Sequence, residues 1–221
     1  MTISDLVTEL IEDILDDTQR LQGDAEARWS DAKLTRYAKE AIKELCSRSS
    51  VLIKNTTVSV VANTSEYQIN ANIRQIFTAA LSLSDYPLIQ ATADELAIKL
   101  GRTWRLKTGT PTHFVRENHK ITLYPKPIVN DTLTIKASHI PATADYEADL
   151  ALIDPAYHKT LLYYMAYKSL LTNDADAGLQ AEAANYLAMF EKEAGSKSSI
   201  HHEQFIFNTP TYGANVPARM C

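Results

Sequence analysis

The feature that most constrains this chain is a change of hydrophobic period, from helical to strand-like and back to helical. The stretch from Gly109 to Pro127 has the pattern of a β-hairpin, and segments with helical spacing lie on both sides of it. A helix with one apolar stripe has to bury that stripe against another element. Helical segments at the two ends of the chain therefore predict a shared helical core, with the strands inserted between them.

Helical spacing marks four segments, at about residues 3–14, 30–50, 154–172 and 175–194. Ser30 suits an N-cap, and Asp154 followed by Pro155 is a typical helix start, because Asp caps well and Pro is tolerated at the first position. Two pairs of helices with one apolar stripe each are satisfied most simply by packing together. We therefore expect a four-helix bundle made from the N- and C-terminal helices.

The middle of the chain reads as strands. The β-branched run 56–61 and the alternation of Leu133, Ile135 and Ala137 indicate strands, and Asn118 suits the left-handed turn of a hairpin. A short helix is expected from 93 to 100, between the cap Thr92 and the stop Gly101. The predicted fold class is α+β. The predicted divisions are a helical bundle (1–54 and 142–194), an inserted antiparallel β subdomain (55–141) and an extended C-terminal tail (195–221), and we expect residues 142–153 to be a connector.

Charge is distributed unevenly along the chain. The net charge of −5 argues against a general nucleic-acid coat, because such a coat usually needs net positive charge. Residues 1–29 hold eight acids and two arginines, whereas residues 98–126 hold seven bases and only Glu117 as an acid. Such a charge dipole can orient a subunit against a partner, although two solvated faces would give the same pattern.

Cysteine use and hydropathy indicate a cytosolic product. The two cysteines are Cys46, in an apolar helical stripe, and Cys221, the last residue, a pattern that fits a reducing compartment. No apolar run approaches 18 residues, and the first residues lack the pattern of a signal peptide. We expect no contact with a membrane.

Motifs that carry chemistry are missing from the sequence. It has no Gly-x-Gly-x-x-Gly, Cys-x-x-Cys or His-Glu-x-x-His pattern, and its serines do not lie in a nucleophile elbow. The adjacent His201 and His202 would point apart in an extended chain, which makes a metal site there improbable. We predict no cofactor, no metal and no catalytic residue, and an enzyme is the last-ranked function.

One candidate binding site is the cluster of Arg102, Trp104, Arg105 and Lys107. Cation and ring together could stack on a nucleic-acid base or grip a phosphate. Alternatively, Trp104 anchors the loop in the core and the basic side chains are solvated. A third alternative is that the cluster meets the acidic residues 1–29 of a neighbouring subunit. The cluster is thus a candidate for a subunit interface or for the lining of a DNA channel.

A second candidate site is the tail, where Phe205, Phe207 and Tyr212 have near-alternating spacing. Such a segment could add to a partner as an extended strand or an aromatic wedge. The alternative is that the tail folds back onto the bundle of its own chain.

Motifs spread over residues 29–194 resemble those of tailed-phage head-to-tail adaptor proteins, including the tail tubular protein A group. They are Trp29–Leu34 with Tyr37, Ala38 and Ala41, Gly109–Pro111, Ile121–Pro127, Thr132–Ile135, Pro141, Ile153–Pro155 with His158, Asp174–Asp176, and Tyr186 with Phe190. The sequence departs from the family at Asn118-His119, where the family often has a glycine-containing turn.

This resemblance implies a structural role without catalysis. Such subunits form a ring, usually twelve-fold, beneath the portal, extend the DNA channel and provide the attachment surface for tail or nozzle proteins. DNA would pass through without sequence-specific binding, and the subunit would be made in the host cytoplasm and reside in the virion at the head-tail junction. The alternatives are another head or tail completion subunit, such as a stopper, and a nucleic-acid-binding regulator that uses residues 98–126.

Overall fold

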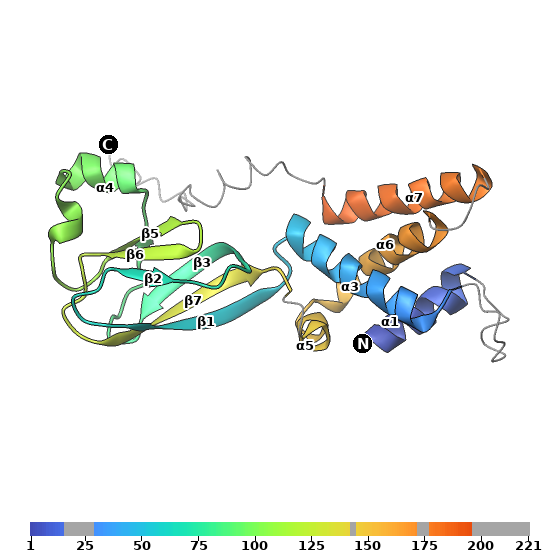
Figure 1. Cartoon of the computed structure of the whole chain (residues 1–221), viewed down its shortest axis with the longest axis horizontal. Coiled ribbons are helices and arrows are strands. Elements are labelled where there is room, and N and C mark those ends of the chain that lie inside the picture. The colour runs from blue at the N-terminus through green and yellow to red at the C-terminus, as the bar shows by residue number, and fades with distance from the viewer. Residues whose placement is uncertain (16–28, 142–144, 172–176, 196–221) are drawn as a thin grey trace, which may run out of the picture. The chain divides into compact units, whose positions relative to one another are not determined.

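A computed structural model describes residues 1–15, 29–141, 145–171 and 177–195 of the chain. These residues form two compact units (Figure 1). The helical unit consists of the described residues of Met1–Ile53 and His139–Lys197, and the β unit consists of Lys54–Ser138. Helices and sheets are both present, as the α+β prediction requires.

The helical unit takes its elements from both ends of the sequence. α6 packs against α1, α3 and α7, and α1 also packs against α3. The bounds are α1 Ile3–Leu10, a π-helical turn Ile11–Leu15, α3 Asp31–Arg48, α5 Tyr146–Ala151, a 3-10 turn Pro155–Tyr157, α6 His158–Leu171 and α7 Ala177–Ala194.

Side-chain caps fix where these helices begin. Thr2 and Asp5 form a capping box at α1, and the Ser30 hydroxyl accepts the backbone N–H of Lys33 at the start of α3. The Asp154 carboxylate accepts the N–H of Ala156 at 2.9 Å, so the 3-10 turn before α6 begins at the predicted Asp-Pro pair. Each cap satisfies a backbone donor that the first turn leaves without an intrahelical partner.

The helical unit has one buried core. Leu10, Leu45 and Leu161 are fully buried in it together with Phe190 of α7, and Leu187 packs against it. Burial of one such side chain is worth about 1.5–3 kcal/mol, so a cluster drawn from all four long helices holds the two ends of the chain together. Cys46 is fully buried in the same cluster, as its place in the apolar stripe predicts.

One element of the helical unit was not predicted. Residues 142–153 were expected to be a connector, but α5 lies within them. Its six residues show no clear helical period, and its N-cap residue Asp145 makes no side-chain cap bond, so the sequence carries little signal for it. The α5 residue Glu147 accepts the backbone N–H of Ile3 at 3.1 Å, which ties α5 to the start of α1.

The β unit holds two sheets. Their strand orders are β1-β7-β3 and β2-β6-β5-β4. The bounds are β1 Ile53–Val60, β2 Glu66–Gln68, β3 Ile73–Leu81, β4 Ile89–Gln90, β5 His113–Glu117, β6 Lys120–Tyr124 and β7 Asp131–His139, and α4 spans Ala93–Leu100. Leu133, Ile135 and Ala137 of β7 are fully buried, and their cluster includes residues of both sheets.

The hairpin of β5 and β6 has the predicted form. The two strands are antiparallel, with Val115 opposite Thr122, and Asn118 adopts φ 54° at the turn. Asparagine reaches this left-handed conformation more readily than most residues, so the turn forms without the glycine common in the resembling family.

The expectation of a purely antiparallel β subdomain was wrong for one pair. β4 pairs with β5 in parallel, with Ile89 opposite His113. The chain between these strands contains α4 and a 3-10 turn, and a crossover of this kind returns the chain to the end where β4 began.

Candidate functional site: the basic loop of the β unit

The candidate loop is held in place by the burial of Trp104. α4 begins with a capping box of Thr92 and Glu95 and ends at Gly101, whose φ of 84° suits glycine, and the 3-10 turn Trp104–Leu106 follows. The Trp104 side chain is only 3% exposed and is buried with Leu96, Val115 and Tyr124. Its ring meets the ring of Tyr124 edge to face at a centroid distance of 5.7 Å. Trp104 thus anchors the loop and does not offer its ring to a base, which agrees with what the second alternative says of Trp104.

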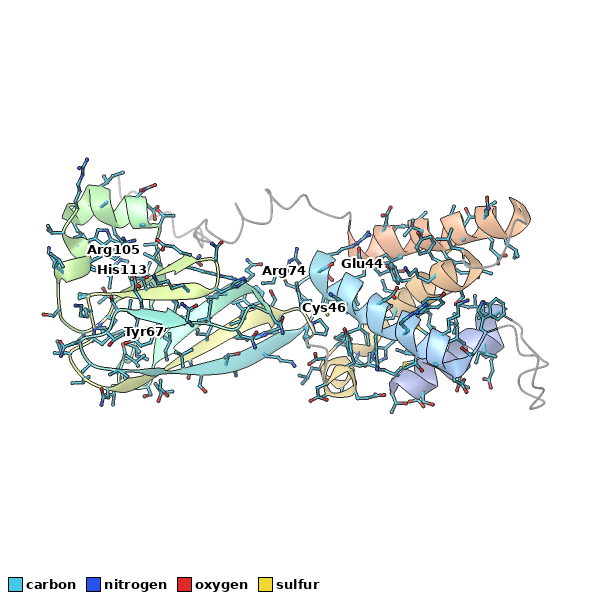
Figure 2. All side chains as sticks on the ribbon, viewed as in Figure 1. Glu44, Cys46, Tyr67, Arg74, Arg105 and His113 are labelled. Atoms are coloured by element: carbon cyan, nitrogen blue, oxygen red, sulfur yellow. The ribbon has the colours of Figure 1, made fainter. Side chains whose placement is uncertain are left out.

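Arg105 is oriented by two contacts. Its guanidinium lies 5.0 Å from the centroid of the Trp104 ring, and Nη2 donates to the Glu117 carboxylate at 3.2 Å. Both partners of this ion pair are about half exposed, so water screens it. Figure 2 shows Arg105 and His113 near α4. These two contacts therefore restrict the conformations of the Arg105 side chain at the surface.

The rest of the loop surface combines cations with exposed apolar side chains. Arg102 and Lys107 are exposed, and Leu106 between them is 73% exposed. Ile98 and Lys99 on the last turn of α4 are exposed as well. Large apolar side chains at such exposure, rimmed by charge, are typical of surfaces that bind other macromolecules.

Two other bases of the 98–126 stretch, Arg116 and Lys120, have structural contacts. Arg116 is only 6% exposed, and its guanidinium donates to the carbonyls of Ile73, Arg74 and Asn118 at 2.6, 2.8 and 3.2 Å. Burial lowers the pKa of Arg116 to about 10, because it disfavours the charged form. Lys120 pairs with Glu66 at 2.5 Å. The basic character that the sequence shows as one run is thus concentrated, at the surface, around α4 and the loop.

His113 lies beside this loop and reflects its charge. Partial burial, and then the positive charge of Lys99, lower the pKa of His113 below its usual value. The ring nitrogen Nδ1 lies 2.8 Å from the Thr112 hydroxyl. Because its pKa is lowered, His113 adds little positive charge to the loop surface at neutral pH.

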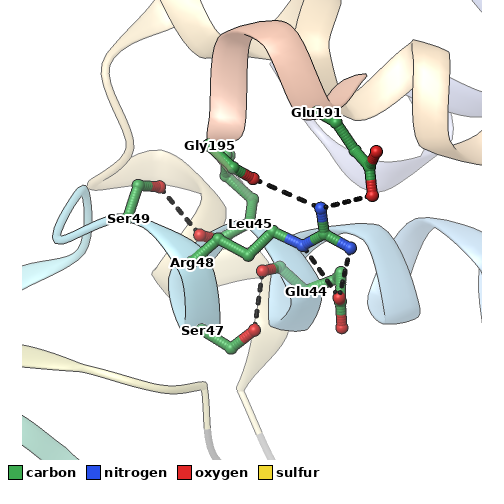
Figure 3. A network of polar contacts seen from close by, with 7 residues as sticks. All are labelled: Glu44, Leu45, Ser47, Arg48, Ser49, Glu191 and Gly195. Atoms are coloured by element: carbon green, nitrogen blue, oxygen red, sulfur yellow. Dashed lines mark hydrogen bonds and ion pairs between the residues drawn. The ribbon is translucent and has the colours of Figure 1, made fainter. Parts of the chain in front are cut away.

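The second candidate site, with Phe205, Phe207 and Tyr212, lies outside the described residues. The described chain ends just before it, at Gly195, which follows α7 and has φ 85°. Arg48 of α3 holds this end (Figure 3): its side chain donates to the Glu191 carboxylate and to the Gly195 carbonyl, both at 3.2 Å, and to Glu44 at 3.0 Å. Arg48 fixes where the tail departs, although sequence reasoning had not singled it out.

Two further features bear on function: helices that could span a membrane and side-chain groups that could hold a metal ion. None of the described helices is long and apolar enough to cross a membrane. Across the described ranges there is also no group of three or more His, Cys, Asp or Glu side chains placed to hold a metal ion.

An anchored loop that combines cations with exposed apolar side chains is typical of proteins that bind other macromolecules. The sequence model of the family described as SU10 adaptor protein matches residues 1–210, nearly the full length of the chain. The chain belongs to this family of phage head-to-tail adaptors. A search of curated proteins gave no match.

Proposed function

We propose that this protein is a structural head-to-tail adaptor that forms an oligomeric ring between the portal and the tail of a tailed phage. The family match over residues 1–210 carries this proposal, because it makes the chain a phage structural adaptor and therefore a component of the virion. The ring, which we expect to be twelve-fold, its place beneath the portal and its contact with tail or nozzle proteins are the proposed part. DNA would pass through its channel without sequence-specific binding, and the protein would catalyse no reaction.

The two units would serve as separate working parts of this adaptor. We propose that α1, α3, α6 and α7 act as a four-helix bundle, which their shared buried cluster supports. The β unit would be an inserted domain that presents the loop with Arg102, Arg105 and Lys107. The segment after Gly195, with Phe205, Phe207 and Tyr212, would bind the portal or a tail component.

The test is to mix the purified protein with portal particles and image the product by electron microscopy. We expect a ring of added density on one end of the portal, with a constant number of subunits. Portal particles that stay bare at saturating protein would contradict the proposal. Density without closed rotational symmetry, in one or a few copies, would favour a stopper or another completion subunit.

A truncation after Gly195 tests the role of the tail. If the tail docks on a partner, the shortened protein keeps the melting temperature of the full chain and loses binding to portal particles. A large fall in melting temperature would instead mean that the tail packs on its own chain. The cut has to leave Gly195 in place, because its carbonyl is an acceptor for Arg48.

The alternative of a nucleic-acid-binding regulator is disfavoured by one observation. Stacking of a base on Trp104 would need an accessible ring, and this ring is buried against Tyr124. A regulator would bind duplex DNA with a steep dependence on salt, so a flat titration at low salt would remove this alternative.

A further inference from the structure

The loop surface of the β unit combines exposed cations with exposed apolar side chains on an ordered backbone, and we call it the knob. The knob consists of Ile98, Lys99, Arg102, Arg105, Leu106 and Lys107, and all six side chains are exposed. Its apolar part is Ile98 and Leu106, and its charged part is four cations. The buried ring of Trp104 lies beneath it.

The backbone of the knob is held by hydrogen bonds on both sides of the loop. The N–H of Trp104 donates to the Gly101 carbonyl at 3.2 Å, and the N–H of Leu106 donates to the Thr103 carbonyl at 2.9 Å. At its far end, the N–H of Lys126 donates to the Lys107 carbonyl at 2.9 Å. A loop that is already ordered loses little conformational entropy when it binds. The knob is therefore suited to insertion into a cleft.

The helical unit carries a cleft of matching character. It is open to solvent, has a volume of about 360 Å³ and is lined by residues of α1, α3 and the start of α5. The ring of Tyr146 and the edges of Ile3 and Val7, which are 5% and 7% exposed, supply apolar surface, and Ser4 and Thr35 add hydroxyl groups. Among the described residues, Asp31, Asp145 and Glu147 add three carboxylates to the lining and Lys39 adds a cation.

Knob and cleft are complementary in two respects. Both combine apolar surface with charge, and their charges are opposite in sign. The knob holds four exposed cations, of which Arg105 is paired with Glu117, whereas the described residues of the cleft supply three carboxylates and one cation. Complementary potentials of this kind select partners and speed their encounter.

We propose that the knob of one copy of this chain docks into the cleft of a neighbouring copy. The proposal rests on the proposed ring, because a closed ring of identical subunits needs a heterologous interface made of two different surfaces. The knob and the cleft are such a pair, since they lie on different units of one chain. Leu106 would enter the apolar part of the cleft, and Arg102 and Lys107 would meet its carboxylates.

A protein partner fits the knob better than DNA does. A phosphate backbone would gain nothing from the exposed side chains of Ile98 and Leu106, which are 84% and 73% accessible. Burying them against the apolar side chains of a cleft is favourable, at about 25 cal/mol per Å² of apolar area.

The test uses two charge-reversal variants of the full chain. The knob variant is Arg102→Glu/Lys107→Glu, which leaves the ion pair of Arg105 intact. The cleft variant is Ser4→Lys/Asp145→Lys. Asp145 is chosen because it makes no side-chain cap bond, whereas Glu147 holds the N–H of Ile3. Circular dichroism and melting temperature establish that both variants fold.

Analytical ultracentrifugation measures self-association of the chain in solution. Electron microscopy shows whether rings form on portal particles. We expect each variant alone to raise the subunit dissociation constant at least about tenfold at low salt, because one variant removes the net positive charge of the knob and the other removes the net negative charge of the cleft. The matched control is Lys136→Glu compared with Arg102→Glu: both remove one exposed cation of the β unit, and Lys136 lies outside the knob.

The decisive measurement is an equimolar mixture of the two variants. In the mixture the unchanged knob of one variant meets the unchanged cleft of the other, and the two acids introduced into the knob meet the two lysines introduced into the cleft, so association should return, with the two chains alternating in even-numbered complexes by native mass spectrometry. Two variants that associate as well as the wild type would overturn the proposal. A third variant carries all four substitutions in one chain. If this variant associates normally and the mixture does not, the proposal is also overturned, because knob and cleft would then meet within a single chain.

Failure of this inference differs from failure of the proposed function. If wild-type rings form on portal particles and both variants form them equally well, the adaptor role stands and the knob-to-cleft contact falls. If portal particles stay bare while the mixture restores self-association, the contact stands and the adaptor role falls. Loss of duplex DNA binding in the knob variant, with unchanged self-association, would assign the knob to DNA and overturn the proposal.

Discussion

In the described part of the chain, each unit holds an arginine with a nearly buried side chain, and the two arginines differ in their hydrogen-bond partners. Arg48 of the helical unit, with a side chain 7% exposed, is bonded to the carboxylates of Glu44 and Glu191 and to the Gly195 carbonyl. Arg116 of the β unit donates to the backbone carbonyls of Ile73, Arg74 and Asn118. Two carboxylates thus contact one guanidinium, and three peptide carbonyls accept from the other.

The difference shows what each arginine holds together. The carboxylates of Arg48 lie on α3 and α7 and reach solvent, with side chains 19% and 48% exposed, so water can replace the arginine. The carbonyls of Arg116 belong to the start of β3 and to the hairpin turn, and Arg116 joins these segments from two different sheets. A buried acceptor that loses its donor costs more than an exposed carboxylate that loses its cation. Loss of Arg116 should therefore be the more damaging.

The comparison can be measured unit by unit because each unit has one tryptophan. Trp29 is buried in the helical unit and Trp104 in the β unit. In a Trp104→Phe background, fluorescence follows the helical unit, and in a Trp29→Phe background it follows the β unit. Each substitution below is placed in the background that reports the unit it affects.

The largest effect is expected for Arg116→Met. It should lower the free energy of unfolding of the β unit by about 3 kcal/mol, since a buried hydrogen bond to Ile73 and two partly buried ones to Arg74 and Asn118 lose their charged donor. Urea denaturation followed by Trp104 fluorescence measures this. Arg102→Met is the control, because Arg102 is exposed, and it should change stability by no more than about 0.5 kcal/mol. Equal stability of the two variants would show that the carbonyls do not need Arg116.

A smaller effect is expected for Arg48→Met. The helical unit should lose about 1–2 kcal/mol, because its two carboxylates can be rehydrated after the cation is removed. Urea denaturation followed by Trp29 fluorescence gives the value. The control is Arg36→Met, whose side chain is 65% exposed and pairs with Glu40 at 3.8 Å, and which should cost under about 0.5 kcal/mol. If Arg48→Met lost more unfolding free energy than Arg116→Met, the arginine bonded to carboxylates would be the more important of the two.

His158 at the start of α6 should make the helical unit sensitive to pH. Its pKa is lowered, chiefly by burial, and in the described part of the chain its Nε2 is buried without a hydrogen-bond partner. The unfolded chain therefore binds a proton more readily than the folded one. Stability should be fully present above pH of about 6.5 and should fall as pH decreases toward the lowered value, by at most about 1.4 kcal/mol per pH unit.

The measurement is urea denaturation of the helical unit between neutral and acidic pH. His158→Phe should flatten the profile, whereas His119→Gln, an exposed position of the β unit, should leave it unchanged. Since Trp29 reports the helical unit, titration of His113 in the β unit does not enter the signal. A profile with the same slope in His158→Phe would assign the pH dependence to other groups.

The smallest effect is expected for Arg105→Met. Its pair with Glu117 and its contact with Trp104 are at the surface, so the β unit should lose about 0.5–1 kcal/mol, less at high salt. Denaturation at two salt concentrations, followed by Trp104 fluorescence, tests this. A loss as large as that of Arg116→Met would mean that the exposed pair contributes as much as the buried contacts.

Local signals in the sequence predicted local structure well. The helix between Thr92 and Gly101 has its capping box and its left-handed stop, and Asn118 has the left-handed turn conformation. Caps and turns depend on residues three or four positions apart, so a sequence displays them directly. The alternation in β7 likewise predicted which side is buried.

Contacts between distant segments were harder to predict. Arg116 reads as one of seven bases in a charged stretch, yet its acceptors Ile73 and Arg74 are 43 and 42 residues away, and no local pattern reveals them. The acceptors of Arg48 at the end of α7 and just after it, Glu191 and Gly195, are 143 and 147 residues away, and only Glu44 lies within one helical turn. The burial of Trp104 was one of three alternatives for the loop, because an aromatic among cations suits a core and a binding surface equally well.

The Arg48 contacts have a mechanical consequence for whatever the tail binds. A pull on the chain beyond Gly195 acts on a carbonyl that Arg48 holds, and the same guanidinium grips Glu191 one turn back. The pulling force would pass through Arg48 into α3, so the last turn of α7 would resist unfolding from its C-terminal end. A subunit tethered through its tail would then transfer tension to its helical core instead of unravelling at the point of attachment.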